Sequence, residues 1–134
     1  MNAANAPREI DLAIHARWIV PVEPAGALDH HALLVDAGRI VAIVPSSGVA
    51  AAWAPRETVE LPTHVLLPGL VNAHAHSAMA LLRGVADDLP LKAWLEDRIW
   101  PREGRHVSPE FVRDGTLIAC AEMLAGGITC CNDM

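Results

Sequence analysis

In the first part of the chain apolar and polar residues alternate, which is typical of half-buried β-strands. Along Ile10–Val20 one set of alternate positions holds Ile10, Leu12, Ile14, Trp18 and Val20, and the other holds Asp11, His15 and Arg17. Successive side chains of a strand point to opposite faces, so the pattern predicts a strand that buries the first set. The stretch "HALLVDAGRIVAIVP" predicts a β-hairpin that turns at Gly38. A further short strand is expected at Thr58–Leu61.

The pattern changes near Pro68. "VLLPGLVNAHAH" is almost continuously apolar before its polar end, as expected for a strand that is buried on both faces of a parallel sheet. Pro90–Trp100 has apolar residues at helical spacing, and a second helix is expected from Ser108 as N-cap to Gly126-Gly127. "ITCCNDM" then predicts another strand. This order of strand, helices and strand predicts an α/β fold that begins a βαβ unit, and it suggests the N-terminal part of something larger.

Composition excludes several classes of protein. The chain has 134 residues, 52% of them hydrophobic, so there is enough apolar surface to bury and a disordered chain is excluded. The net charge is −6 and the basic residues are scattered, so no nucleic-acid partner is expected, while a small neutral or cationic substrate is compatible. No leader peptide or membrane span is predicted, and a cytoplasmic location follows as the expectation. Cys120, Cys130 and Cys131 lack metal-site spacing and are expected to be reduced and buried.

The end of the apolar strand carries the candidate chemistry. His74 and His76 in "NAHAHS" are two residues apart, so in a strand both imidazoles lie on one face and can converge on one metal ion. The alternative is a pair of surface histidines without a shared ligand. A catalytic zinc takes three protein ligands, and nothing later in the chain completes the set. His106 is expected at the surface, and Asp133 is expected to have a structural role.

The residues also carry a resemblance. "LLPGLVNAHAHSAMALLRGVADDLPLKAWLEDRIWPRE" resembles the first barrel strand and following loop of the amidohydrolase superfamily. Within it, the chain is most similar to the S-adenosylhomocysteine and 5′-methylthioadenosine deaminases, in the branch that includes the triazine hydrolases and chlorohydrolases. The resemblance implies that residues 1–66 are part of a small β-sandwich and residues 67–134 the first βαβ portion of a (β/α)8, TIM-like barrel.

The resemblance also implies a mechanism. One divalent metal ion, zinc in the first instance, would be held partly by His74 and His76, and the other ligands and the acid/base residues would lie beyond Met134. Water activated by the metal would attack C6 of the adenine ring and release ammonia. Glu103 in "WPRE" matches the glutamate that accepts hydrogen bonds from the ribose hydroxyls, and Trp94 is a candidate for the lining of the nucleoside pocket. No catalytic acid or base is assigned to residues of this chain.

Three alternatives stay open at this point. The substrate class of the branch includes guanine, cytosine and triazine compounds, although Glu103 favours a substrate that carries ribose. A 134-residue chain that acts alone would be an inactive or vestigial metal-binding module, because a complete barrel needs about 250 residues. Trp94 could equally be core packing, and Arg83, Asp87 and Asp88 are expected to form loop salt bridges.

Overall fold

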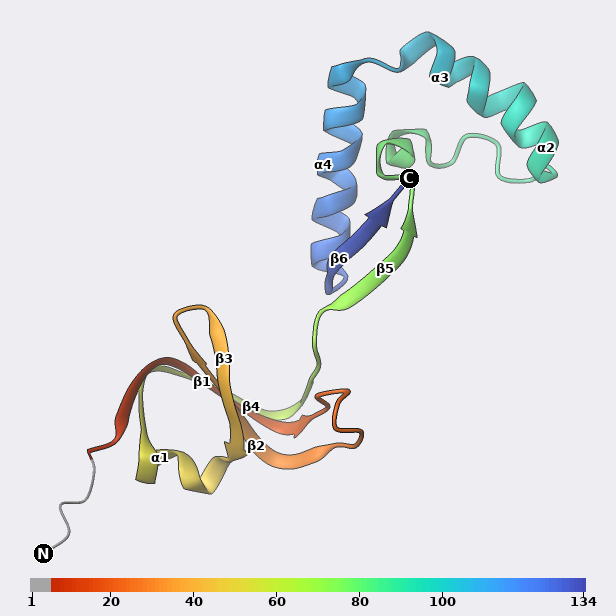
Figure 1. Ribbon diagram of the computed structural model, residues 1–134. Helices are drawn as coiled ribbons and strands as arrows, with labels where there is room; N and C mark the ends of the chain where they lie inside the picture. The colour runs from red at the N-terminus through yellow and green to blue at the C-terminus, as the bar shows by residue number, and fades with distance from the viewer. Residues whose placement is uncertain (1–5) are drawn as a thin grey trace, which may run out of the picture. The chain divides into compact units, whose positions relative to one another are not determined.

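The computed structural model describes residues 6–134, and the chain divides into two compact units. The first unit ends at Pro68 and the second begins at Gly69 (Figure 1). The assignment of the two parts to a β-sandwich and a barrel stays a prediction.

The first unit is a four-stranded sheet with the strand order β3-β2-β1-β4. The strands are β1 (Arg8–Ile19), β2 (Leu28–Asp36), β3 (Arg39–Pro45) and β4 (Trp53–Leu66). β2 pairs antiparallel with β1 and β3, whereas β4 pairs parallel with β1. Parallel strands need a crossover rather than a tight turn. The chain supplies it through β2, β3, the 3-10 turn η1 (Ser46–Gly48) and the short helix α1 (Val49–Ala52).

The predicted hairpin is confirmed. β2 and β3 are joined by Ala37 and Gly38, and both have positive φ, 49° and 72°. Positive φ at both central residues is the geometry that matches the twist of paired strands. Only glycine adopts it without steric cost, so Ala37 needs support. Its N–H donates a hydrogen bond of 2.8 Å to Asp11 Oδ2.

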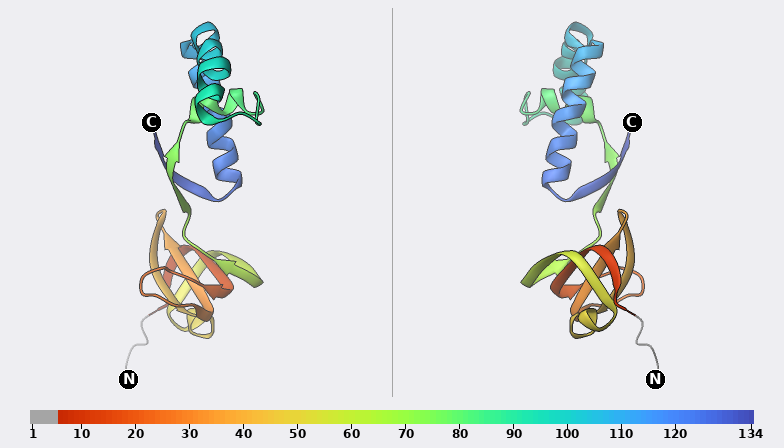
Figure 2. Two further views of the ribbon diagram at one scale, coloured as in Figure 1. Left: turned by 90° about the vertical axis from the view of Figure 1, so that its right-hand side faces the viewer. Right: turned by 90° about the vertical axis from the view of Figure 1, so that its left-hand side faces the viewer.

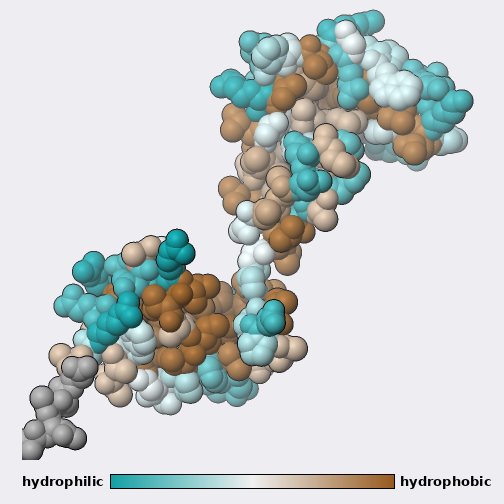
Figure 3. All heavy atoms as spheres, viewed as in Figure 1, coloured by the Kyte–Doolittle hydropathy of each residue, from teal (hydrophilic) through white to brown (hydrophobic). Residues whose placement is uncertain are grey.

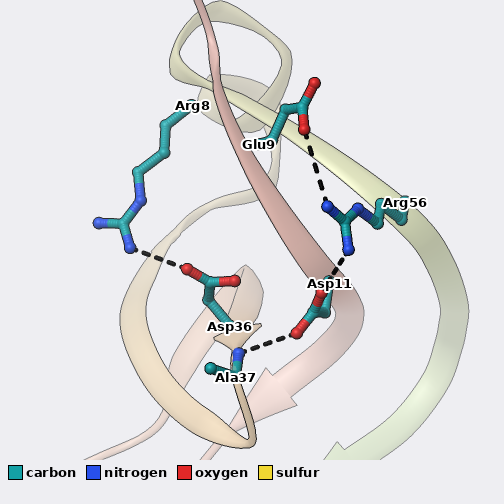
Figure 4. Close-up of polar contacts among 6 residues, drawn as sticks. All are labelled: Arg8, Glu9, Asp11, Asp36, Ala37 and Arg56. Atoms are coloured by element: carbon teal, nitrogen blue, oxygen red, sulfur yellow. Dashed lines mark hydrogen bonds and ion pairs between the residues drawn. The ribbon is translucent and has the colours of Figure 1, made fainter.

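Asp11 belongs to a chain of polar contacts that joins β1, β4 and this turn (Figure 4). Arg56 on β4 donates to Asp11 Oδ1 at 3.3 Å and lies 3.8 Å from Glu9. Arg8 donates to Asp36 Oδ2 at 3.0 Å. These groups are exposed, so each pair contributes little by itself. Their effect is to hold the β2–β3 turn against the first strand.

The predicted strand at Ile10–Val20 is confirmed, but within the set predicted to be buried only Ile10 is fully buried. The buried residues are Ile10, Ala13, Ala16 and Ile19. Trp18 is exposed, and the pairing of β1 with β4 shifts register between Ala16 and Trp18. The buried positions depart from strict alternation already at Ala13, before this shift. The core of the unit consists of Ile10, Ala13, Ala32, Leu34 and Val49.

The second unit pairs β5 (Leu70–Ala75) parallel with β6 (Ile128–Asp133) (Figure 2). Between them lie the 3-10 helix η2 (Ser77–Leu82), helix α2 (Leu91–Trp94), the π-helical turn η3 (Leu95–Ile99), helix α3 (Trp100–His106) and helix α4 (Pro109–Ala125). The helix punctuation at Ser108 and Gly126 is confirmed, since Ser108 Oγ accepts a hydrogen bond of 3.1 Å from Phe111 N–H. The order strand, helices, strand is therefore as predicted.

The predicted strand at Thr58–Leu61 is confirmed and extends further, over Trp53–Leu66. The prediction for the apolar run that follows is wrong in two respects. Val65 and Leu66 belong to β4, and β5 starts only at Leu70 after an interruption at residues 67–69. β5 is also not buried on both faces: Leu70 and Val71 are exposed, and apolar surface is visible on this unit in Figure 3. Among the described residues β5 has one strand neighbour, β6, so its other edge has no partner.

The cysteines give a mixed outcome. All three are free, as expected, but Cys130 and Cys131 are exposed on β6 and Cys120 is half-buried on α4. β6 has only β5 beside it among residues 6–134, which leaves its side chains uncovered.

In the part of the chain that the structure describes, no helix combines the length and the apolar character needed to cross a bilayer.

Candidate metal and substrate site

The two candidate ligands lie side by side where β5 ends. His74 is the next-to-last residue of β5, and His76 directly precedes η2. Their ring centroids are 5.0 Å apart and the ring planes are nearly perpendicular, at 83°. Both side chains are exposed. The structure therefore brings the two imidazoles together on one accessible surface.

The backbone around the pair is tied to neighbouring elements. His74 N–H donates to Asn72 Oδ1 at 3.2 Å, and Ser77 N–H donates to Asp133 Oδ1 at 2.9 Å. His76 Nδ1 lies 3.2 Å from the main-chain oxygen of Met134. The hydrogen bond from Ser77 N–H is the main cause that lowers the pKa of the Asp133 carboxyl, and a nearby charge on His76 acts in the same direction. Asp133 thus ties the end of β6 to the residue after His76, and its expected structural role stays a prediction.

A pocket of about 600 Å³ borders this end of the strand. Its lining comes from β5, η2, the loop that follows η2, α2 and α4, and includes His76, Arg83, Trp94 and Glu122. Such a volume is in the range of small-molecule sites. Trp94 is fixed in the lining because its indole Nε1–H donates to Val85 O at 3.0 Å. This bond satisfies the polar group of the partly buried indole.

Arg83 and Glu122 form an ion pair across the pocket's edge. The two terminal nitrogens of the Arg83 guanidinium each donate to one oxygen of the Glu122 carboxylate, at 2.8 and 2.6 Å. The hydrogen bond with Arg83 lowers the pKa of the Glu122 carboxyl, and the same bond raises the pKa of Arg83. The expected salt bridge of Arg83 is thereby confirmed. Among residues 6–134, neither Asp87 nor Asp88 has an ion-pair partner, so for these two the expectation is wrong.

Glu103 lies apart from this pocket. It is half-buried on α3, and its main-chain oxygen accepts a hydrogen bond of 2.9 Å from Val107 N–H at the end of the helix. Neither Glu103 nor His74 contributes to the described lining, whereas His76 and Trp94 do. The structure thus places His74 and His76 together where β5 ends and brings His76 and Trp94 into one pocket lining, whereas Glu103 lies further along the helical segment that begins with α2 and is not in that lining.

The donor set fits part of a metal site. Two exposed imidazoles, two residues apart with ring centroids 5.0 Å apart, suit zinc, whose nitrogen ligands lie at about 2.0–2.1 Å. Within residues 6–134 no cluster of three or more His, Cys, Asp or Glu side chains is placed to hold a metal ion. The described residues therefore supply two ligands and do not complete a catalytic site, which takes three.

Sequence reasoning missed three residues that shape this region. Asn72 lies two residues before His74 and four before His76, so in a strand it is expected on the same face as the two histidines. The strand pattern could therefore have indicated Asn72. Ser77 is the buried polar residue of the described chain, at 5% exposure, and Gly115 on α4 lies against the backbone of Ala78. Neither of these long-range contacts has a signature in local sequence.

The comparisons place the chain in a family. Residues 65–134 match the model of the amidohydrolase family, so the chain belongs to that family. It is 53% identical to a 5-methylthioadenosine/S-adenosylhomocysteine deaminase from Saccharophagus degradans, over 92% of this chain and 28% of the relative. The corresponding protein from Teredinibacter turnerae is 48% identical, over 93% of this chain and 28% of the relative. The chain thus spans a little over a quarter of the length of these relatives.

Solved structures agree. The chain superposes with a TM-score of 0.92 on an adenosine deaminase from Xanthomonas campestris with bound zinc, at 53% identity, covering 96% of this chain and 29% of that one. An atrazine chlorohydrolase from Arthrobacter aurescens, complexed with zinc, gives 0.75 at 24% identity, over 91% of this chain and 28% of that one. The second likeness shows a shared fold only. Mixed α/β structure of the amidohydrolase kind is therefore established for this chain.

Proposed function

We propose that the protein is a metal-dependent hydrolytic deaminase of adenosine thioethers, which converts S-adenosylhomocysteine or 5′-methylthioadenosine to the inosyl product and ammonia. The observation that carries the proposal is the pair of imidazoles at the end of β5, 5.0 Å apart and beside a 600 Å³ pocket, in a chain 53% identical to a deaminase of that name. The proposal includes the (β/α)8 barrel, with β5 as its first strand and residues 1–66 as part of a β-sandwich.

His74 and His76 would supply two ligands of one divalent metal ion, zinc in the first instance. Zinc supplies Lewis-acid chemistry that makes water a competent nucleophile at neutral pH. For this the two imidazoles must be neutral and present a ring nitrogen each. The contact of His76 Nδ1 with the Met134 main-chain oxygen supports a tautomer in which Nδ1 carries the proton and Nε2 is left to bind.

Trp94 and Glu103 would bind the nucleoside. Trp94 is held with its indole in the pocket wall by the bond to Val85 O, so it presents an apolar surface without a loose polar group. Glu103 would accept hydrogen bonds from the two ribose hydroxyls, because an ionised carboxylate offers acceptors to two neighbouring donors. Its carboxylate has no ion-pair partner within residues 6–134, which leaves it available.

The test is deamination by the purified, zinc-loaded protein at its natural length, followed by product chromatography. S-adenosylhomocysteine and 5′-methylthioadenosine should both yield inosyl products, and His74→Ala should abolish turnover. Glu103→Gln should lower kcat/KM by about 10- to 100-fold, the loss expected for a hydrogen bond to a charged group. Glu96→Gln is the matched control, since Glu96 is an exposed glutamate on the same helical segment and pairs only loosely with Lys92, at 3.9 Å.

A 2′-deoxy substrate isolates the role of Glu103. The wild-type protein should lose activity on it, and Glu103→Gln should lose little more, because the missing hydroxyl and the missing charge remove the same interaction. Equal and additive losses would contradict the assignment of Glu103 to ribose. Turnover of guanine or a triazine in place of the thioethers would contradict the proposed substrate class.

A further inference from the structure

We propose that Asp133 is a positioning residue for His76: its carboxylate, by accepting the hydrogen bond of Ser77 N–H, holds the chain after β5 so that His76 keeps its metal-binding orientation. This inference rests on the proposed function, in which His74 and His76 hold a metal. Asp133 touches neither the substrate nor the metal in this assignment.

The hydrogen bond joins the Asp133 carboxylate on β6 to the main-chain N–H of Ser77, which lies directly after His76. Ser77 is only 5% exposed, and its N–H meets Asp133 Oδ1 at 2.9 Å. A buried backbone N–H without a partner costs free energy comparable to a lost hydrogen bond. Ser77 begins η2, where the N–H groups of the first turn have no intrahelical acceptor. The Asp133 carboxylate therefore determines where η2 begins, directly after His76.

The end of β6 and the residue after it contact Ala75 and His76 at two further points. Ala75 and Asp133 are register partners of β5 and β6, and Met134 N–H donates to Ala75 O at 3.1 Å. The Met134 main-chain oxygen lies 3.2 Å from His76 Nδ1. On the other side α4 packs against η2 at Gly115, where a Cβ would overlap the Ala78 carbonyl group. Residues 75–78 are thus held between β6 and α4 through main-chain contacts.

This arrangement gives the Asp133–Ser77 bond a chemical consequence. Groups that orient metal ligands without touching the metal typically change metal affinity 10- to 100-fold when they are removed. Loss of the carboxylate would release the Ser77 main chain, and His76, the preceding residue, would lose its fixed direction. His74 is held separately through Asn72 Oδ1, so the effect should fall on one ligand of the two.

The experiment measures zinc affinity by competition with a chromophoric chelator, without substrate, on the purified protein at its natural length. Asp133→Ala should raise the zinc Kd by about 10- to 100-fold. Asp133→Asn should stay within about threefold of wild type, since the amide oxygen can still accept from Ser77 N–H. Asp114→Ala is the matched control, because Asp114 is an exposed carboxylate on α4 whose ion pair is with its neighbour Arg113. Thermal unfolding of the metal-free forms separates positioning from general stability.

A second variant keeps the test open if Asp133→Ala does not fold. Ser77→Pro removes the donor and leaves Asp133 intact, because proline has no N–H and is tolerated at the first position of a helix. It should raise the zinc Kd as Asp133→Ala does. A folded Asp133→Ala or Ser77→Pro with wild-type zinc affinity overturns the inference, and so does an Asp133→Asn that loses as much affinity as Asp133→Ala.

The outcomes also distinguish this inference from the proposed function. A wild-type protein that binds zinc and loses affinity in Asp133→Ala, yet does not deaminate the thioethers, supports the inference and contradicts the proposed function. A protein that deaminates them while Asp133→Ala keeps its zinc contradicts the inference alone. A wild-type protein that binds no zinc contradicts both.

Discussion

The two units of the chain use their apolar residues differently. The first closes a core of fully or nearly fully buried side chains around Ile10, Ala13, Ala32, Leu34 and Val49. The second buries Leu82, Ile99 and Ala119 but leaves twelve of the seventeen exposed large hydrophobic side chains of the described chain on its surface. It also carries every candidate site residue. The first unit is therefore stabilised by side-chain packing, and the second depends more on main-chain contacts and on single polar interactions.

The largest expected effect is in the first core. Leu34 is fully buried on β2, so Leu34→Ala should lower the free energy of unfolding of this unit by about 2–5 kcal/mol. Urea unfolding can be followed by the fluorescence of Trp18 and Trp53, with Trp94 and Trp100 replaced by Phe. Ile40→Ala is the control, since Ile40 is 65% exposed and the change should cost within about 0.5 kcal/mol. Equal losses in the two variants would contradict a core centred on Leu34.

The next effect tests the main-chain contacts of the second unit. A Cβ at Gly115 would overlap the carbonyl of Ala78, so Gly115→Ala should destabilise this unit by about 1–3 kcal/mol, as overpacking does. Gly104 on α3 has nothing within 4 Å of its added Cβ. Gly104→Ala should therefore stabilise by up to about 1 kcal/mol, the difference in helix propensity. Unfolding monitored by Trp94 and Trp100 measures both, and the same sign for the two variants would contradict the close approach.

This pair of glycines illustrates what the sequence could and could not predict. Local punctuation predicted the helix from Ser108 to Gly126 and the hairpin turn at Gly38, because caps and turns depend on neighbouring residues. Nothing local distinguishes Gly115 from Gly104. Their difference arises from the packing of η2 on α4, which joins residues far apart in the chain.

The strands teach the same lesson. Alternation predicted that Ile10–Val20 forms a strand, but Ala13 and Ile19, which alternation placed on the other face, are buried and Trp18 is exposed. At the candidate site, the spacing of His74 and His76 predicted that the rings lie together. The bond from Ser77 to Asp133, fifty-six residues later in the chain, depends on strand register and was not predictable.

A helix cap gives a smaller effect. Ser108 Oγ accepts from Phe111 N–H at the start of α4, so Ser108→Ala should cost about 1 kcal/mol in the second unit. Ser108→Asp should retain most of that stability, because a carboxylate can accept the same bond. Urea midpoints of the two variants provide the measurement. A Ser108→Asp protein as unstable as Ser108→Ala would show that the cap is not the cause.

The smallest expected effect is a pH dependence of the stability of the second unit, which the first unit should not share. The Glu122 carboxyl has a pKa below its ordinary value of 4.5 because Arg83 donates to it. The folded form thus favours the ionised carboxylate, so the stabilisation is complete above the unfolded pKa and disappears as the pH falls through the lower folded pKa. Glu122→Gln should remove this part of the acid dependence from the Trp94 and Trp100 signal and leave the Trp18 and Trp53 signal unchanged. Both side chains are largely exposed, so added salt should weaken the effect. An acid transition of the second unit that is identical in wild type and Glu122→Gln would show that other carboxylates determine it, and the ion pair would then be only a geometric feature of the pocket's edge.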